Sequence, residues 1–351
     1  MCGRALSARV AALAPPRAHG LPLEPASLRA VPEDFLVEEE LGFGPSGSGQ
    51  HLLLKVRKRD ANTAWVARSL ARASGCRDFE VGYAGLKDRR AVALQWFTVP
   101  RPRSGPDLRG LAGEGFEVLE VHAHARKLPR GALAGNRFEL RVRPADGDGP
   151  ALAARLAPRL EELARRGVPN YFGPQRFGRD GANLTRPPGG LAALRGAQRG
   201  FLLSAARSVL FNAVLAERVA DGSWELLVPG DLAILDGRGS LFSVPAADAA
   251  LAARCARLEI HPSGALWGVG DPPTAGQARE LELTVSGRYP EESALCAAAG
   301  MQHERRALRL ALRDSSCEAE AGAALLRFRL GRGCFATALL RELIEAAAAD
   351  D

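Results

Sequence analysis

The chain has 351 residues, which is enough for two domains that each bury a core of their own. Its hydrophobic content of 46% and charged content of 25% exclude a disordered chain and are typical of a soluble globular protein. The formal net charge of +7 is compatible with an anionic partner such as a nucleic acid, without requiring one.

Six scattered cysteines and the distribution of apolar residues narrow the class of protein further. The cysteines form no Cys-x-x-Cys pair, so we expect reduced thiols in a cytoplasmic protein and no metal site. No run approaches the roughly eighteen apolar residues that cross a membrane. The apolar stretch Val10 to Ala14 is too short for a signal core, and Pro15 and Pro16 interrupt it. Residues 1–20 therefore read as a loose tail.

The first predicted elements are two strands and a helix. Residues 35–41 and 51–56 are apolar-rich runs on either side of a Gly-Pro-Ser loop, which predicts a hairpin. The loop at 42–47 matches G-x-G-x-x-G, but a strand follows it instead of the helix that a dinucleotide site needs, so we discount the match. Residues 62–73 have helical spacing, with Asn62 or Thr63 as the cap at the start and Gly75 at the end.

The remaining elements alternate in type along the chain. Phe138-Glu-Leu-Arg-Val-Arg shows the apolar–polar alternation of a half-buried strand. The other predicted segments are strands at 91–99, 116–121, 226–228, 233–235 and 325–330, helices at 151–166, 203–220, 246–257 and 336–348, a Gly- and Pro-rich surface excursion at 178–200, and a turn at 331–333. This order predicts an α+β fold with a mostly antiparallel sheet, followed by a second mixed region.

The stretch Gly82 to Arg90, Gly-Tyr-Ala-Gly-Leu-Lys-Asp-Arg-Arg, has the strongest chemical signal. It places a single carboxylate, Asp88, beside Lys87, Arg89 and Arg90. Neighbouring positive charge favours the ionised carboxylate, which is the form that covalent chemistry at a sugar or base carbon requires. From these nine residues alone, an ordinary turn with surface ion pairs is the favoured interpretation.

Four further motifs change that preference. They are Pro32–Glu38, Gly135-Asn-Arg-Phe138, Val168-Pro-Asn-Tyr-Phe-Gly-Pro-Gln-Arg-Phe-Gly178 and Cys334-Phe-Ala-Thr-Ala-Leu-Leu-Arg-Glu342. Together with the Asp88 turn they resemble the TruD family of tRNA pseudouridine synthases. The resemblance runs from about Leu28 to Ile344, with every motif in family order.

The resemblance implies an isomerase that acts on tRNA, typically at uridine 13, and needs no cofactor. Such an enzyme breaks the N1–C1′ glycosidic bond, turns the uracil and rejoins it through C5. Asp88 matches the catalytic aspartate of the family, which either attacks C1′ or assists elimination at the sugar. The sequence leaves both routes open.

The resemblance also implies a set of substrate-binding residues. Phe35, Asn136 and Phe335 match positions that line the target-uridine site, and Phe138 matches an aromatic beside it. A flipped base needs a face to stack on, and an amide offers both the donor and the acceptor that the imide edge of uracil requires. Core packing for each Phe and a turn for Asn136 are the alternatives. The motif context favours the site for all except Phe138, where the two interpretations are level.

Two cations are expected to support Asp88. Arg29 stands where the family often has lysine, so we expect an ion pair whose geometry differs from that of lysine. Lys87 is retained directly beside the acid in a chain that is poor in lysine.

The family architecture implies a division into domains. It assigns residues 21–166 and 310–351 to the catalytic pseudouridine synthase domain and 167–309 to an inserted, family-specific α/β domain. The tRNA would lie in a cleft between them, and the family leans towards a monomer. Six basic residues are expected at this cleft, either as phosphate contacts or, with at least equal weight, as a solvated face: Arg57, Lys58, Arg126, Lys127, Arg130 and Arg176.

A second class of function stays open at this point. A tRNA-binding or tRNA-folding module that has lost catalysis would share the basic residues, and its usual mark is a replaced aspartate. Asp88 is present, which weakens this alternative. A carboxylate-dependent hydrolase would show a paired acid, a histidine or a metal cluster, and we set it aside.

Overall fold

The computed structural model describes residues 14–102, 107–185 and 190–346. Its internal contacts divide the chain into two compact units, which we describe separately. The sheet unit comprises Leu23–Glu161, Leu312–Gly333 and the described residues from Leu343 onward. The helical unit comprises the described residues up to Pro22, Glu162–Ala311 and Cys334–Glu342.

The contact division runs close to the predicted domain boundaries. It cuts the chain after Glu161 and after Ala311, whereas the predicted inserted domain spans 167–309. It also groups Cys334–Glu342 with the helical unit, although the resemblance assigns this segment to the catalytic domain. The functional division into a catalytic and an inserted domain stays a prediction.

The described end of the predicted loose tail is packed, so that expectation is wrong for residues 14–20. His19 is buried, with Nε2 3.0 Å from the carbonyl oxygen of Gly167 and Nδ1 3.3 Å from Oε1 of Glu162. The backbone amides of Ala18 and His19 donate to Oε2 of the buried Glu342. A buried carboxylate requires such donors, and this part of the chain supplies them. Residues 1–13 lie outside the described residues.

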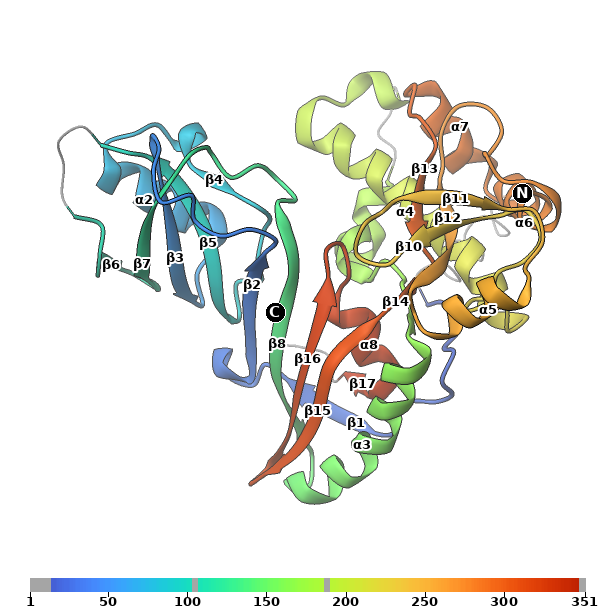
Figure 1. Ribbon diagram of the computed structural model, residues 1–351, viewed down its shortest axis with the longest axis horizontal. Helices are drawn as coiled ribbons and strands as arrows, with labels where there is room; N and C mark the ends of the chain where they lie inside the picture. Colours follow the sequence, from blue (N-terminus) through green and yellow to red (C-terminus); the bar gives the residue numbers. More distant parts are fainter. Residues whose placement is uncertain (1–13, 103–106, 186–189, 347–351) are drawn as a thin grey trace. The chain divides into compact units, whose positions relative to one another are not determined.

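A single sheet of eleven strands forms the framework of the sheet unit (Figure 1). In pairing order its main strands are β15 (Leu312–Glu320), β16 (Ala323–Gly331), β8 (Leu133–Pro144), β2 (Phe35–Leu41), β5 (Val92–Pro100), β3 (His51–Arg59), β7 (Phe116–His124) and β6 (Ala112–Gly113). Off this path, β1 (Pro25–Leu28) pairs with β8 and β17 (Glu345–Ala346), and β4 (Gly82–Tyr83) pairs with β5. Among the described residues, only β2–β5 and β1–β17 are parallel, which confirms the predicted mostly antiparallel sheet.

The predicted hairpin of residues 35–41 and 51–56 is wrong. Both strands form, but β5 lies between them, parallel to β2 (Leu36 opposite Val92) and antiparallel to β3 (Arg59 opposite Val92). The side chains of Ala93, Phe97 and Val99 are fully buried, so β5 takes a central position with a partner on each side. The loop between β2 and β3 is long enough to pass over one strand, because neighbouring strands lie about 4.8 Å apart.

Helix α2 (Thr63–Ser74) covers β3, β5 and β7 and confirms the helix predicted at 62–73. Asn62 caps its start, because the Asn62 side-chain oxygen accepts from the amide of Ala64 at 2.8 Å. Gly75 ends it in the left-handed conformation at φ 70°. The apolar face of the helix joins one core with the three strands, formed by Leu54, Val56, Val66, Ala67, Leu70, Ala71, Phe97, Val99 and Val118 among others.

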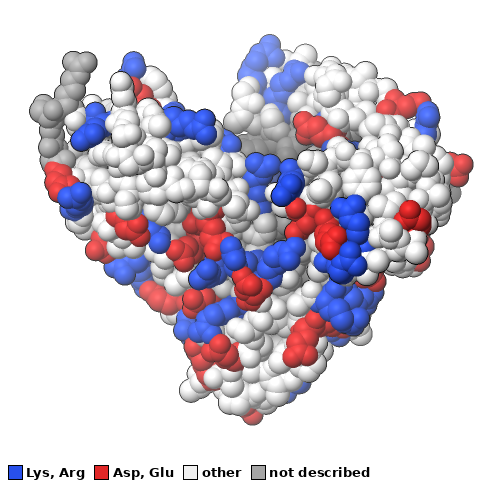
Figure 2. Space-filling model, viewed as in Figure 1, with Lys and Arg blue, Asp and Glu red and all other residues white. Residues whose placement is uncertain are grey.

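The outer face of β8, β16 and β15 carries ion pairs. Arg329 contacts both Glu40 and Asp314, and Arg327 contacts both Glu318 and Glu139. Figure 2 shows basic and acidic side chains intermixed over this face. The excess positive charge of the chain is therefore not concentrated here.

Helix α4 (Gly196–Ala220) is the core of the helical unit, where it packs among Tyr171, Phe177 and Trp224. The other helices of the unit are α5 (Ala249–Ala256), α6 (Gly276–Arg288), α7 (Pro290–Ala298) and most of α8 (Ala336–Leu343). Its strands are β9 (Val168–Pro169), β10 (Asp231–Leu235), β11 (Leu241–Val244), β12 (Ile260–Leu266), β13 (Glu304–Ala307) and β14 (Arg309–Leu310), and α3 (Gly149–Arg166) runs from one unit into the other. Within the described residues, α4 has the length and composition to cross a membrane, but 67% of that stretch is buried inside the protein, as in a core helix.

The second half of the chain was predicted less well than the first. Helices α6 and α7 were not predicted, and residues 226–228 form a turn region instead of a strand. The predicted helix at 336–348 ends at Leu343, after which β17 joins the sheet beside β1.

Candidate active site

Four chain segments meet at one end of the large sheet. β2 and β5 begin there in parallel, β3 ends there, and β7 begins there, as the pairs Leu36–Val92, Arg59–Val92 and Lys58–Phe116 show. The segment before β2 contains Arg29, and the segment before β5 contains Asp88. Residues that are 59 positions apart in the sequence are thereby brought into contact.

Asp88 is paired with Arg29. The Nη2 atom of Arg29 donates to Oδ2 of Asp88 at 2.5 Å, and the guanidinium carbon of Arg29 lies 4.1 Å from the centre of the Phe35 ring. Arg29 has φ 65°, a conformation that is uncommon for a residue other than glycine. The Asp88 side chain keeps 37% of its surface exposed. A half-exposed carboxylate held by a guanidinium over an aromatic ring is the central feature of this site.

Lys58 fixes the main chain of the same turn. Its Nζ donates to the carbonyl oxygen of Asp88 at 2.5 Å and to that of Ala61 at 2.9 Å, and its side chain is fully buried. Burial lowers the pKa of Lys58 to about 8, and the nearby charge of Asp88 only partly opposes this shift. The expectation that Lys58 contacts phosphates is therefore wrong, because its ammonium group faces the interior.

The side chain of Lys87 contacts residues of β2 and β8. Its Nζ lies 3.0 Å from Oε1 of Glu39 and donates to Oδ1 of Asn136 at 2.6 Å. Glu39 is fully buried in β2, and Asn136 lies opposite it in β8. Lys87 thus supports the site through Glu39 and Asn136, whereas Arg29 contacts Asp88 directly.

The two phenylalanines of the predicted site lie on the same face of the sheet. Phe35 and Phe138 meet edge to face with ring centres 6.1 Å apart, and Phe138 stacks on Phe328 at 5.1 Å. Both Phe35 and Phe138 are buried. The guanidinium of Arg29 covers the ring of Phe35, so a base that approaches this ring contacts the guanidinium first.

Side chains under the turn hold its shape. Gln95 of β5 donates through Nε2 to the carbonyl oxygen of Gly85 at 2.8 Å, and its Oε1 accepts from the hydroxyl of Thr63 at 3.1 Å. The same Thr63 hydroxyl oxygen accepts from the amide of Lys87 at 3.1 Å. Sequence reasoning missed Gln95, Thr63 and Glu39, because buried polar residues inside strands and helices have no signal of their own without their partners.

Phe335 belongs to the helical unit, where it lies in a cluster of aromatic rings and guanidinium groups. The ring centre of Phe172 is 6.4 Å away, and the guanidinium carbons of Arg306 and Arg176 lie 5.7 and 6.0 Å from the Phe335 ring. Phe335 is 38% exposed, which leaves part of its ring open for stacking. Arg176, predicted as a phosphate contact, also donates to the hydroxyl of Ser204 at 3.0 Å.

The titratable groups beside Phe335 have shifted pKa values. Burial lowers the pKa of Arg306 to about 10, so this guanidinium stays charged at neutral pH. Burial also raises the pKa of the Cys334 thiol to about 11, which the neighbouring Arg306 only partly opposes. A raised pKa favours the neutral form of the Cys334 thiol.

Three of the four other predicted phosphate contacts in the sheet unit already have partners. Lys127 donates to the carbonyl oxygen of Phe79, Arg130 lies 3.7 Å from the centre of the Tyr83 ring, and Arg57 forms an exposed pair with Glu117. In ranges 14–102, 107–185 and 190–346, no group of three or more His, Cys, Asp or Glu residues could hold a metal ion.

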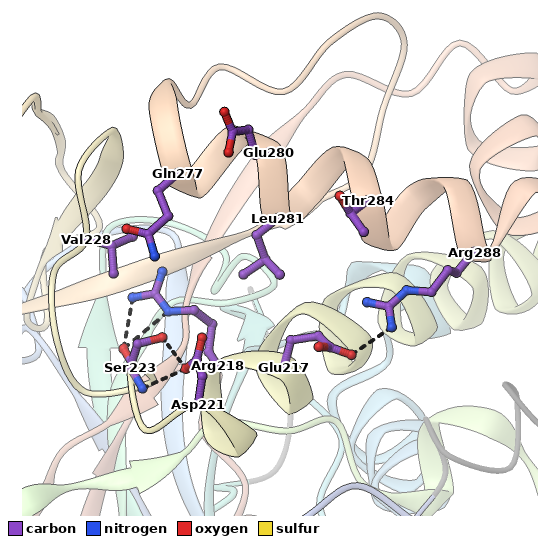
Figure 3. Close-up of a pocket in the computed structure, with 10 residues that line it drawn as sticks. All are labelled: Glu217, Arg218, Asp221, Ser223, Val228, Gln277, Glu280, Leu281, Thr284 and Arg288. Atoms are coloured by element: carbon purple, nitrogen blue, oxygen red, sulfur yellow. Dashed lines mark hydrogen bonds and ion pairs between the residues drawn. The ribbon is translucent and has the colours of Figure 1, made fainter.

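A cavity of about 420 Å³ in the helical unit lies between α4 and α6 (Figure 3). Its cations are engaged, because Arg288 pairs with Glu217 at 2.8 Å and Arg218 donates to the carbonyl oxygen of Ser223 at 2.9 Å. The cavity holds none of the predicted site residues. We therefore place the candidate site at the Asp88 turn and not at this cavity.

The fold is that of a pseudouridine synthase. A structure titled "putative tRNA pseudouridine synthase D (TruD)" from Methanosarcina mazei matches with a TM-score of 0.70, covering 93% of this chain and 95% of that one. The sequence identity is 20%, so this likeness supports the fold alone.

Sequence comparisons identify the family. The family model described as tRNA pseudouridine synthase D (TruD) matches residues 25–186 and 185–343. Relatives named tRNA pseudouridine synthase D include one from Xanthomonas euvesicatoria at 47% identity (93% of this chain, 94% of the relative) and one from Pseudomonas entomophila at 46% (94% of each). The chain therefore belongs to the TruD family of tRNA pseudouridine synthases, which are isomerases.

Proposed function

We propose that this chain converts uridine 13 of tRNA to pseudouridine, with Asp88 as the catalytic carboxylate. The observation that carries the proposal is the Arg29–Asp88 pair at 2.5 Å, which leaves the carboxylate half exposed at the end of the sheet. A guanidinium donor stabilises the ionised carboxylate and orients it. The family supports tRNA as the substrate, and the choice of uridine 13 rests on the resemblance of the motifs.

Both possible routes begin with the ionised carboxylate. In the first, an Asp88 oxygen bonds to C1′ as the N1–C1′ bond breaks, the uracil turns, and C5 attacks C1′ and displaces the carboxylate. In the second, Asp88 removes the C2′ proton as the N1–C1′ bond breaks to leave a C1′=C2′ double bond, and that proton returns to C2′ as C5 bonds to C1′. In either case C5 loses its proton and N1 gains one, so atoms and electrons balance without a cofactor.

The other site residues have proposed roles around the flipped uridine. Phe335 offers a partly exposed ring face for stacking. Phe35 is buried beneath the Arg29 guanidinium and offers its ring once that group moves aside, and Phe138 packs against Phe35 edge to face. Asn136 presents its amide to the uracil edge, while its Oδ1 is held by Lys87. Arg29 and Lys87 act as supporting cations.

We also propose a cofactor-free monomer that acts in the cytoplasm. An isomerisation that conserves atoms and electrons needs no redox partner or group donor. The five cysteines within the described residues are unpaired, which agrees with a reducing compartment.

The test measures tritium release from tRNA labelled at uridine C5, comparing a tRNA with its counterpart that carries cytidine at position 13. We expect stoichiometric release from the first and none from the second. Equal release from both would contradict uridine 13. No release from either, with tRNA binding intact, would instead favour a binding module without catalysis.

A further inference from the structure

A second cavity adjoins the Asp88 turn on the sheet unit. Its volume is about 370 Å³, within the usual range of roughly 300–1,000 Å³ for ligand pockets. It is lined by Asp60, Ala61, Asn62, Trp65, Arg89, Glu114 and Gly115. None of these residues has a role in the chemistry described above.

The cavity and the turn that carries Asp88 are tied together. Arg89 follows Asp88 directly and lines the cavity. Lys58 donates both to the carbonyl oxygen of Asp88 and to that of Ala61, which also lines the cavity. The amide of Asp60 donates to the carbonyl oxygen of Ala91 at 3.2 Å. A ligand in the cavity would therefore contact a residue that directly follows Asp88 in the sequence.

The floor of the cavity depends on a glycine. Gly115 has φ 71°, and a Cβ atom there would lie 2.9 Å from the carbonyl oxygen of Arg59 and 3.0 Å from Cβ of Ala61. The amide of Arg59 donates to the carbonyl oxygen of Gly115 at 2.9 Å. This close approach of the start of β7 to the end of β3 sets the base of the cavity.

The walls combine an aromatic ring, carboxylates and one cation. Trp65 is partly buried, and its Nε1 donates to the carbonyl oxygen of Glu114 at 3.4 Å. Among the residues that the structure describes, the Glu114 carboxylate has no ion pair. Arg89 faces Asp60 at 3.6 Å, and both side chains are largely exposed, so the pair is weak and open to exchange.

We propose that this cavity binds the nucleobase next to the target uridine. This inference rests on the proposed function. The guanidinium carbon of Arg72 lies 5.6 Å from the centre of the Trp65 ring and covers one face, so the indole offers its remaining surface for stacking. The carboxylates of Glu114 and Asp60 accept from ring or amino N–H groups of the base, and Arg89 leaves Asp60 to bind the adjoining phosphate. Enzymes that flip a base commonly contact the nucleotides on either side of it.

The test crosses protein variants with tRNA substrates. The substrates are intact tRNA and two tRNAs with an abasic nucleotide immediately 5′ or 3′ of the target uridine, and the readout is kcat/KM from tritium release. We expect Trp65→Leu to lower kcat/KM about 5- to 150-fold on intact tRNA, the range of one base–aromatic stack. On one of the two abasic tRNAs this loss should disappear. Trp65→Phe, which keeps a ring, should stay near the parent.

Two controls keep the test decisive. Trp96→Leu removes another partly buried tryptophan of the sheet unit, and its effect should be equal on all three tRNAs. If Trp65→Leu does not fold, Glu114→Gln at an exposed position serves in its place, with the same dependence on the neighbouring base. An effect that is equal on all three tRNAs, or absent, would overturn the inference. Failure of the parent on intact tRNA would overturn the proposed function itself.

Discussion

The contact between Arg29 and Asp88 is the most specific residue-level feature of the site. A hydrogen bond to a charged group contributes about 1.5–3 kcal/mol, so Arg29→Met should lower kcat about 10- to 150-fold. Arg29→Lys should retain an intermediate rate, because the charge remains without the planar fork of donors. Single-turnover kinetics on tRNA labelled at C5 measures the effect.

A matched control for this prediction is Arg57→Met. Arg57 also pairs with a carboxylate on the sheet unit, at 2.6 Å from Glu117, but both side chains are exposed and the pair does not include Asp88. It should leave kcat unchanged. Equal losses in the two variants would show that the Arg29 effect is general and not tied to Asp88.

Lys58 predicts a pH dependence of stability. Its folded pKa of about 8 lies below its ordinary value of 10.5, so the folded state binds the proton less tightly than the unfolded state. Burying the charged form of Lys58 destabilises the folded state, and this loss of free energy is fully present below the folded pKa of about 8. It shrinks as the pH rises above 8 and is gone above the unfolded pKa of 10.5. The free energy of unfolding therefore gains on the order of 3 kcal/mol from this group across that window.

Urea unfolding of the parent and of Lys58→Met at several pH values tests this prediction. The parent should become more stable relative to the variant as the pH rises from 8 to 10.5. Lys127→Met, which removes an exposed lysine, serves as the control and should show no such divergence. A difference between the parent and Lys58→Met that stays constant with pH would mean that Lys58 is not held in the buried position.

At the scale of elements, the close packing of β8 on β16 positions Asn136. A Cβ atom at Gly135 would lie 2.5 Å from the carbonyl oxygen of Leu330, which is backbone and cannot yield without moving a strand. Gly135→Ala should lower the free energy of unfolding by about 1–3 kcal/mol and reduce activity, because β8 must shift. Gly44→Ala, with open space around it, should change neither.

Thermal and urea unfolding of these two glycine variants, with tritium release from the same preparations, provides the measurement. Wild-type stability and activity in Gly135→Ala would show that β8 and β16 are not packed as closely as described.

The elements also show how far the sequence could predict this molecule. Strand β2 and helix α2 followed from local signals, namely the apolar-rich run from Phe35 and the cap at Asn62. The position of β5 between β2 and β3 could not be predicted from local signals. Which strands pair depends on which of them is buried in the core, and residues far apart in the sequence form that core. Helices α6 and α7 have little amphipathic pattern and were missed.

The candidate site divides in the same way. The contact between Arg29 and Asp88 was predicted and is present. The inward orientation of Lys58 was not predicted, since a lysine in a basic stretch reads as a surface residue until its buried carbonyl partners are known. Glu39 is one of three consecutive glutamates, and the sequence does not show which of them belongs to the site. That depends on the strand register, which places Glu39 opposite Asn136.

At the scale of the whole molecule, the net charge of +7 predicts salt-dependent binding of tRNA. Each phosphate that is neutralised releases counterions, so the logarithm of the association constant should fall linearly with the logarithm of salt concentration. With about four to six contacts, the affinity should fall roughly 50- to 2,000-fold between 50 and 200 mM salt. Filter binding or fluorescence anisotropy measures the slope, and an affinity that is independent of salt would contradict a phosphate-based interface.

The central claim is that Asp88 is the catalytic carboxylate, and tritium release from tRNA labelled at uridine C5 tests it most directly in Asp88→Asn and Asp88→Glu. The account predicts no release by Asp88→Asn, although it still binds tRNA, because an amide can neither attack C1′ nor take the C2′ proton. Asp88→Glu keeps the charge at a displaced position and should retain at most a small fraction of the rate. Release by Asp88→Asn at the rate of the parent would contradict the account and assign the chemistry to another group.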